Sequence, residues 1–240
     1  MPAEPLVCLL PGLLCDATVW EPQRRSLSDL AEVHIADLWG LGSFQDMAIK
    51  VLDETSGPLA VAGHSMGGRV ALEMWRLASD RIRGLALLDT GFHGPRPHEA
   101  PARMALVELA YQEGMAAVAA QWFPPIVHPD RVSDRALMDP LVEMVCRATP
   151  QIFGRQQRAG LQRPDATSYL SRIACPTLIL CGREDSWSPL AQHEEMAGRV
   201  SRATLRVVEH CGHMATVERP AEVGDALRNW LGSVESQGTP

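Results

Sequence analysis

The chain has 240 residues, of which 46% are hydrophobic and 21% are charged, and its formal net charge is -7. This composition is typical of a globular protein with one sizeable core and room for a small insertion. The 22 basic residues are scattered among 29 acidic ones and form no basic run. A surface that follows phosphates is therefore excluded, and no nucleic-acid partner is expected.

The N-terminal segment and the cysteines indicate the compartment. The apolar stretch from Leu6 to Leu14 has no basic region before it and is broken at Pro11 and Gly12, so neither a signal peptide nor a membrane span is expected. Three of the six cysteines lie in or beside apolar runs, where a cysteine usually serves as a small hydrophobe. Reduced thiols in the cytoplasm are favoured over a disulfide framework.

Short apolar runs alternate with helix-like segments over the first 91 residues. The pattern predicts strands at 6–10, 33–36, 58–62 and 84–88, and helices at 18–30, 44–54 and 69–77. Ser43 is the expected cap of the second helix. Nearly continuous apolar strands separated by helices predict an α/β protein, whose mostly parallel sheet carries helices on both faces.

The alternation stops between Gly91 and Arg172. This segment predicts only helices, at 102–113, 115–122, 134–147 and 149–160. Strands return at 176–181 and 203–208, a last helix is expected at 220–231, and the tail 232–240 is expected to fray. We therefore expect a core formed by residues 1–91 and 173–240, and a helical cap formed by residues 92–172.

The pattern G-x-S-x-G occurs at residues 63–67, between a predicted strand and a predicted helix. A one-residue corner there forces Ser65 into a strained backbone, and side chains at 63 and 67 would collide, so both positions need glycine. Ser65 would lie at a helix N-terminus, where free N–H groups favour developing negative charge. A plain tight turn is the alternative, and a phosphate loop is excluded because no Lys-Ser/Thr follows the glycines.

A serine becomes a nucleophile when a base takes its proton, and the base needs an orienting acid. Asp185 follows the fifth predicted strand and His213 follows the sixth, so the chain order is Ser, Asp, His. Other residues are alternatives for these roles: Glu184 and Asp89 for the acid, and His210 and His64 for the base.

Further motifs support a family resemblance. The pattern G-x-x-D-x-x-x-P occupies 182–189, and Gly212-His213 precedes Glu218-Arg219-Pro220. Over nearly its whole length the chain resembles the capped α/β-hydrolase superfamily, in the group that includes pimeloyl-acyl-carrier-protein methyl ester esterase, meta-cleavage C–C hydrolases and menaquinone-pathway synthase. The resemblance implies that Ser65 is the nucleophile, His213 the general base and Asp185 its orienting partner. It also implies about six core strands where eight are common, because the usual first hairpin is largely missing.

The resemblance also implies an oxyanion hole of two backbone N–H groups. Met66 is expected to give one of them. Leu13 is expected to give the other, with Leu14 as second choice, although Pro11 replaces the histidine that relatives commonly carry.

The expected activity is hydrolysis of a small carboxylic ester through an acyl-enzyme. C–C bond hydrolysis or a menaquinone-type lyase reaction on the same residues is the alternative, and a non-catalytic ligand-binding relative is a further one. Relatives of the lyase type carry arginines that hold a carboxylated substrate, and Arg69, Arg103, Arg155 and Arg158 are candidates, although Arg69 is expected to face solvent or pack.

No cofactor and no metal are expected, because the histidines at 193, 210 and 213 lack the spacing of a metal motif. The expected partner is a small-molecule ester, and the chain is expected to be a monomer or homodimer away from membranes. An apolar substrate pocket is expected, and its candidate residues are Leu14, His64, Met104, Trp122, Phe123, Trp187 and Met214.

Overall fold

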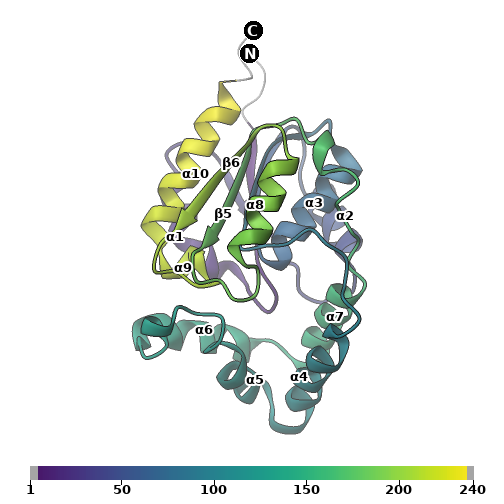
Figure 1. The fold of residues 1–240 in the computed structure, drawn as a ribbon, viewed down its shortest axis with the longest axis vertical. Helices are drawn as coiled ribbons and strands as arrows, with labels where there is room; N and C mark the ends of the chain where they lie inside the picture. Colours follow the sequence, from purple (N-terminus) through teal and green to yellow (C-terminus); the bar gives the residue numbers. More distant parts are fainter. Residues whose placement is uncertain (1–4, 237–240) are drawn as a thin grey trace.

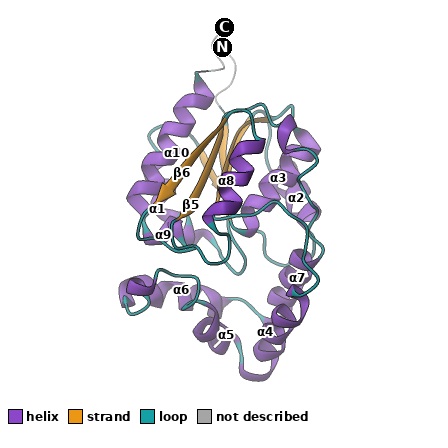
Figure 2. Cartoon of the chain, in the orientation of Figure 1, coloured by secondary structure: helices purple, strands orange, loops and turns teal. Residues whose placement is uncertain are grey.

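A single six-stranded sheet forms the centre of the computed structural model, which describes residues 5–236 (Figures 1 and 2). The strand order is β2-β1-β3-β4-β5-β6, and every neighbouring pair is parallel. The strands are β1 (Leu6–Leu10), β2 (Val33–Ile35), β3 (Leu59–His64), β4 (Ile82–Leu88), β5 (Thr177–Gly182) and β6 (Ala203–Val208). The predicted α/β class and the predicted number of strands are confirmed.

Helices cover both faces of the sheet. Figure 1 shows α1 (Glu21–Leu27) and α10 (Pro220–Glu235) on one face, and α2 (Phe44–Glu54), α3 (Met66–Ala78) and α8 (Leu190–Arg199) on the other. The short helix α9 (Ala215–Glu218) precedes α10. Strands β1, β3 and β5 are almost wholly buried between these layers, which explains their nearly continuous apolar sequences.

The helices differ from the sequence prediction at several places. The helix expected at 18–30 is a short 3-10 turn (Ala17–Val19) followed by α1, and Pro22 lies in the first turn of α1. Helix α8 was not expected. Helix α10 extends to Glu235, so four residues of the tail expected to fray are helical, and 237–240 lie outside the described residues.

Between β4 and β5 the described chain forms four α-helices and two 3-10 turns. They are α4 (Glu99–Glu113), α5 (Met115–Trp122), η2 (Pro129–Arg131), α6 (Arg135–Arg147), α7 (Pro150–Leu161) and η3 (Leu170–Arg172). Figure 1 shows α4 to α7 beyond the arrowheads of β5 and β6, at the carboxyl edge of the sheet. We call residues 92–172 the helical insertion. Within residues 5–236, no helix has the length and apolar character that a membrane crossing needs.

The corner between β3 and α3 has the strained geometry that its sequence predicts. Ser65 has φ 54° and ψ -115°, a conformation that residues with side chains rarely adopt. A Cβ on Gly63 would meet the backbone of Gly67, and a Cβ on Gly67 would meet the backbone of Leu10. The prediction that both positions require glycine is confirmed.

Gly67→Ala should lower the free energy of unfolding by about 1–3 kcal/mol, because the added methyl group overpacks rigid backbone. Gly232→Ala is the matched control, since Gly232 lies in α10 with open space around its Cα. The control should be neutral or raise stability by up to about 1 kcal/mol. Urea unfolding midpoints measure both, and equal effects would contradict this account of the corner.

Candidate active site

Ser65, His213 and Asp185 meet at the carboxyl edge of the sheet. His213 Nε2 lies 2.8 Å from Ser65 Oγ, and His213 Nδ1 lies 2.8 Å from Asp185 Oδ2. The three residues follow β3, β6 and β5 respectively, and parallel strands end at one shared edge. The structure therefore brings together the three side chains that the sequence singled out.

The surroundings of Asp185 keep it ionised. Its Oδ1 accepts hydrogen bonds from the N–H groups of Trp187 and Ser188, both at 2.8 Å. Burial alone would raise the pKa of Asp185, but the charge of His213 and these hydrogen bonds outweigh it, so the pKa lies below its ordinary value. A carboxylate at Nδ1 holds the proton on that nitrogen. Nε2 is then left to accept the Ser65 hydroxyl proton.

Glu184, a rival for the acid role, is directed elsewhere. Its carboxylate accepts a hydrogen bond from Cys211 N at 2.9 Å. Asp185 therefore occupies the orienting position at His213 Nδ1, as predicted.

Asp89, the other rival, organises the backbone beneath the site. Its Oδ1 accepts from Gly182 N at 2.9 Å and its Oδ2 from Ala215 N at 3.2 Å, so it links the ends of β4, β5 and α9. The side chain is fully buried. Burial first, and the charge of Asp185 second, raise its pKa well above the ordinary value.

His64 supports the loop that carries His213. Its Nε2–H donates to the His213 carbonyl at 2.7 Å. Burial lowers the pKa of His64 to about 4, so the ring is neutral at pH 7 and donates from Nε2. His64 therefore belongs to the wall of the corner, as expected.

The backbone around Ser65 offers two N–H groups to a developing oxyanion. Met66 N is the first amide of α3, and such amides have no acceptor within their own helix. Leu13 N has no partner within residues 5–236, and Leu13 and Met66 line one cavity with Ser65. Leu14 N donates to Gln156 Oε1 at 2.9 Å, which removes the second choice for this role.

A cavity of about 750 Å³ opens between Ser65 and the helical insertion. Of the seven predicted pocket residues, one, Trp187, is among the described residues that line the cavity. The other six are not, which corrects the prediction: Leu14, His64, Trp122, Phe123 and Met214 are buried behind its wall, and Met104 faces a separate hollow on the outside of α4. Trp122 packs against Trp187 at 5.6 Å between ring centroids.

Several arginines line this cavity together with apolar side chains such as Leu13, Leu106 and Trp187. Arg69 was expected to face solvent or pack, but it lines the cavity one helical turn after Ser65, and its Nη1 donates to His93 O at 2.7 Å. Burial first, and the charge of Arg163 second, lower the pKa of Arg69 to about 9. Arg69 follows Ser65 by four residues, so both lie on the same face of α3. This spacing is the sequence signal that could have predicted Arg69 in the cavity.

Arg103 and Arg163 lie on the same wall and share one carboxylate. Arg163 pairs with Glu99 at 2.5 and 2.7 Å, and Arg103 contacts Glu99 at 3.4 Å and Gln157 at 2.8 Å. Together with Arg69, these side chains bring more positive than negative charge to the cavity. Arg155 donates to Gly40 O, and Arg158 lines the hollow outside α4. Neither is among the described residues that line the cavity.

An all-parallel sheet with a serine on a strand-to-helix corner, and an acid and a histidine on later loops, is the architecture of the α/β hydrolases. The chain belongs to the alpha/beta hydrolase family, whose sequence model matches residues 6–226.

Several relatives cover almost the whole chain. It is 27% identical to the pimeloyl-[acyl-carrier protein] methyl ester esterase of Nitrosomonas europaea, over 91% of this chain and 92% of the relative. It is 26% identical to (E)-2-((N-methylformamido)methylene)succinate hydrolase of Acinetobacter baylyi, over 95% of this chain and 90% of that relative. The malate-bound structure of a thermophilic esterase from Thermogutta terrifontis is similar with a TM-score of 0.87 and 28% identity, covering 98% of this chain and 92% of the other.

A serine-directed phosphonate should add its mass to the peptide that contains Ser65, and Ser65→Ala should abolish the labelling. Asp185→Asn should slow the labelling by a factor on the order of 10³–10⁴, because the histidine tautomer is lost. Glu184→Gln is the control and should slow it much less. Mass spectrometry measures the rates, and labelling that persists without Ser65 would refute its assignment.

Proposed function

We propose that this hydrolase cleaves a carboxylic ester that carries a second, free carboxylate, with Ser65 as the nucleophile. One observation carries the proposal: the hydrogen-bonded chain Asp185–His213–Ser65 opens into a cavity that Arg69 also lines, one helical turn after Ser65. The helical insertion acts as the cap over this cavity. The six free cysteines, four of them buried, fit a cytoplasmic enzyme.

The reaction follows from the geometry of the three side chains. Ser65 Oγ attacks the ester carbonyl while His213 Nε2 takes its proton and then returns it to the leaving alcohol. Asp185 holds the imidazole and stabilises the imidazolium. The N–H groups of Leu13 and Met66 stabilise the oxyanion. Water then attacks the acyl-enzyme in the same way, and this sequence requires no cofactor.

The substrate carboxylate would bind the arginine wall. A partly buried guanidinium without its own carboxylate is incompletely solvated, and an anionic ligand compensates with charge-assisted hydrogen bonds. Arg69 is such a group, since it donates to the His93 carbonyl and lies beside Arg163. Two relatives support this class: one is named for hydrolysis of a substituted succinate, and an esterase structure holds malate. Both compounds are dicarboxylates.

Ester turnover is the first test. Wild-type protein should hydrolyse p-nitrophenyl acetate, and Ser65→Ala should reduce kcat by several orders of magnitude, because the nucleophile is removed. Spectrophotometric release of p-nitrophenolate measures the rate. If neither neutral nor carboxylated esters are turned over by the wild type, ester hydrolysis is the wrong reaction.

The second test compares a charged with a neutral ester. Mono-p-nitrophenyl glutarate should be preferred over p-nitrophenyl valerate, which has a methyl group in place of the carboxylate. Arg69→Met should lower kcat/KM for the glutarate ester by roughly 30-fold or more, since unpairing a buried charge costs about 2–5 kcal/mol.

The neutral ester separates recognition from structure. Arg69→Met should change its kcat/KM little, and Arg155→Met, a surface control, should leave both substrates unaffected. An equal loss for the two esters would show that Arg69 supports the fold of the site and does not bind a carboxylate.

A further inference from the structure

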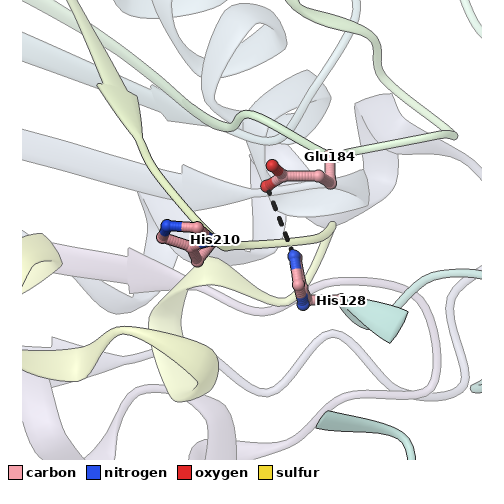
Figure 3. Close-up of side chains that lie close together, drawn as sticks. All are labelled: His128, Glu184 and His210. Carbon is pink, nitrogen blue, oxygen red and sulfur yellow. Dashed lines mark ion pairs between the residues drawn. The ribbon is translucent and has the colours of Figure 1, made fainter. Parts of the chain in front are cut away.

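Three side chains outside the cavity form a compact cluster. They are His128, Glu184 and His210, whose metal-ligating atoms all lie within 4.8 Å of one another. Figure 3 shows the Glu184 carboxylate directed at the His128 ring, with His128 Nε2 3.9 Å from Glu184 Oε2. The rings of His128 and His210 meet edge to face, with centroids 6.0 Å apart.

The cluster joins three separate parts of the chain. His128 belongs to the helical insertion and caps η2, Glu184 precedes Asp185 after β5, and His210 follows β6. The residues are far apart in the sequence, so a search for local metal spacing, which predicted no metal, does not reveal them. The fold brings them together beside the two loops that carry the acid and the base.

We propose that His128, Glu184 and His210 bind a divalent transition-metal ion of the zinc type. Two imidazole nitrogens and one carboxylate oxygen form a ligand set that zinc uses, and water fills the fourth position. Metal–ligand bonds of about 2.0–2.2 Å place tetrahedral ligands roughly 3.4 Å apart. The cluster therefore has to contract by roughly 1 Å. His210, which is exposed, has the freedom to make that movement.

Neighbouring groups already orient two of the ligands. Cys211 N donates to Glu184 Oε2 at 2.9 Å and fixes that carboxylate. His128 Nδ1 accepts from Asp130 N at 3.2 Å, so its proton lies on Nε2 in the free protein. Metal binding at Nε2 would place the imidazole proton on Nδ1, so the hydrogen bond from Asp130 N would break, and the Asp130 carboxylate, 4.0 Å away, could then accept a hydrogen bond from Nδ1–H. A carboxylate behind a ligating histidine is the usual support in metal sites.

A bound ion would link the helical insertion to the loops that carry Asp185 and His213. His213 N already donates to Ile126 O at 2.7 Å, and a Cβ on Gly212 would meet the backbone of residues 126–128, so these segments lie in direct contact. None of the three proposed ligands is among the described residues that line the cavity beside Ser65. The ion therefore stabilises the contact between the helical insertion and the loop that carries His213. It takes no part in attack on the substrate, so the proposed metal site is independent of the proposed ester hydrolysis.

Chelator-treated protein titrated with Co²⁺ should show the visible absorption of a tetrahedral site, with one ion per chain. Zn²⁺ at about a hundredfold excess over Kd should raise Tm by roughly 5–10 °C. His210→Ala should weaken binding at least tenfold while leaving the Tm of metal-free protein nearly unchanged, because its side chain is exposed. His34→Gln, on β2 at the opposite edge of the sheet, is the matched control and should bind normally.

A replacement ligand gives a positive signature. His210→Cys should retain Co²⁺ and add a thiolate-to-cobalt charge-transfer band that the wild type lacks, because the new thiolate joins the ion. Absence of Co²⁺ and Zn²⁺ binding to the wild type would overturn the proposal. Binding that is unchanged in both His210→Ala and His128→Ala would overturn it as well, since the ion would then lie elsewhere.

Discussion

The backbone packing around Ser65 is the constraint on which the rest of the site depends. The glycines of the corner lie in direct contact with their neighbours: Gly67 lies against the backbone of Leu10, and Gly68 lies against the side chain of Thr90. The Thr90 hydroxyl in turn donates to Ser65 O at 2.7 Å. Strands β1, β3 and β4 therefore meet at one point. Ser65 and the loop that carries Leu13, which both line the cavity, are positioned by the same few contacts.

Buried carboxylates fix the remaining loops by accepting backbone N–H groups. Asp89 accepts hydrogen bonds from Gly182 N at the end of β5 and from Ala215 N at the start of α9. Glu218 accepts from His128 N at 2.8 Å, Gly212 N at 3.1 Å and Met214 N at 3.0 Å. It thus secures the histidine loop on both sides and ties it to the helical insertion. Charged groups in these places organise backbone that would otherwise be buried without partners.

The sequence predicted the parts of the molecule that local chemistry determines. Backbone sterics require the glycines at the corner, and burial between helices requires apolar strands. The chain path sets the order of Ser65, Asp185 and His213, and the structure brings these three residues together. The pocket was predicted poorly because apolar residues of the insertion, such as Phe123, bury themselves against one another. Long arginines reach the cavity from helix faces that spacing alone does not orient, and the cluster at His128 depends on contacts between distant segments.

The contacts among Ser65, Asp185 and His213 also span a long stretch of chain. Ser65 and His213 are 148 residues apart, and β5 and β6, which lead to Asp185 and His213, are made last. During synthesis Ser65 leaves the ribosome well before His213, and parallel pairing of β4 with β5 must wait for the whole insertion to emerge. The nascent chain therefore carries Ser65 without its histidine partner, and the hydrogen-bonded chain Asp185–His213–Ser65 forms only when the final edge of the sheet is in place.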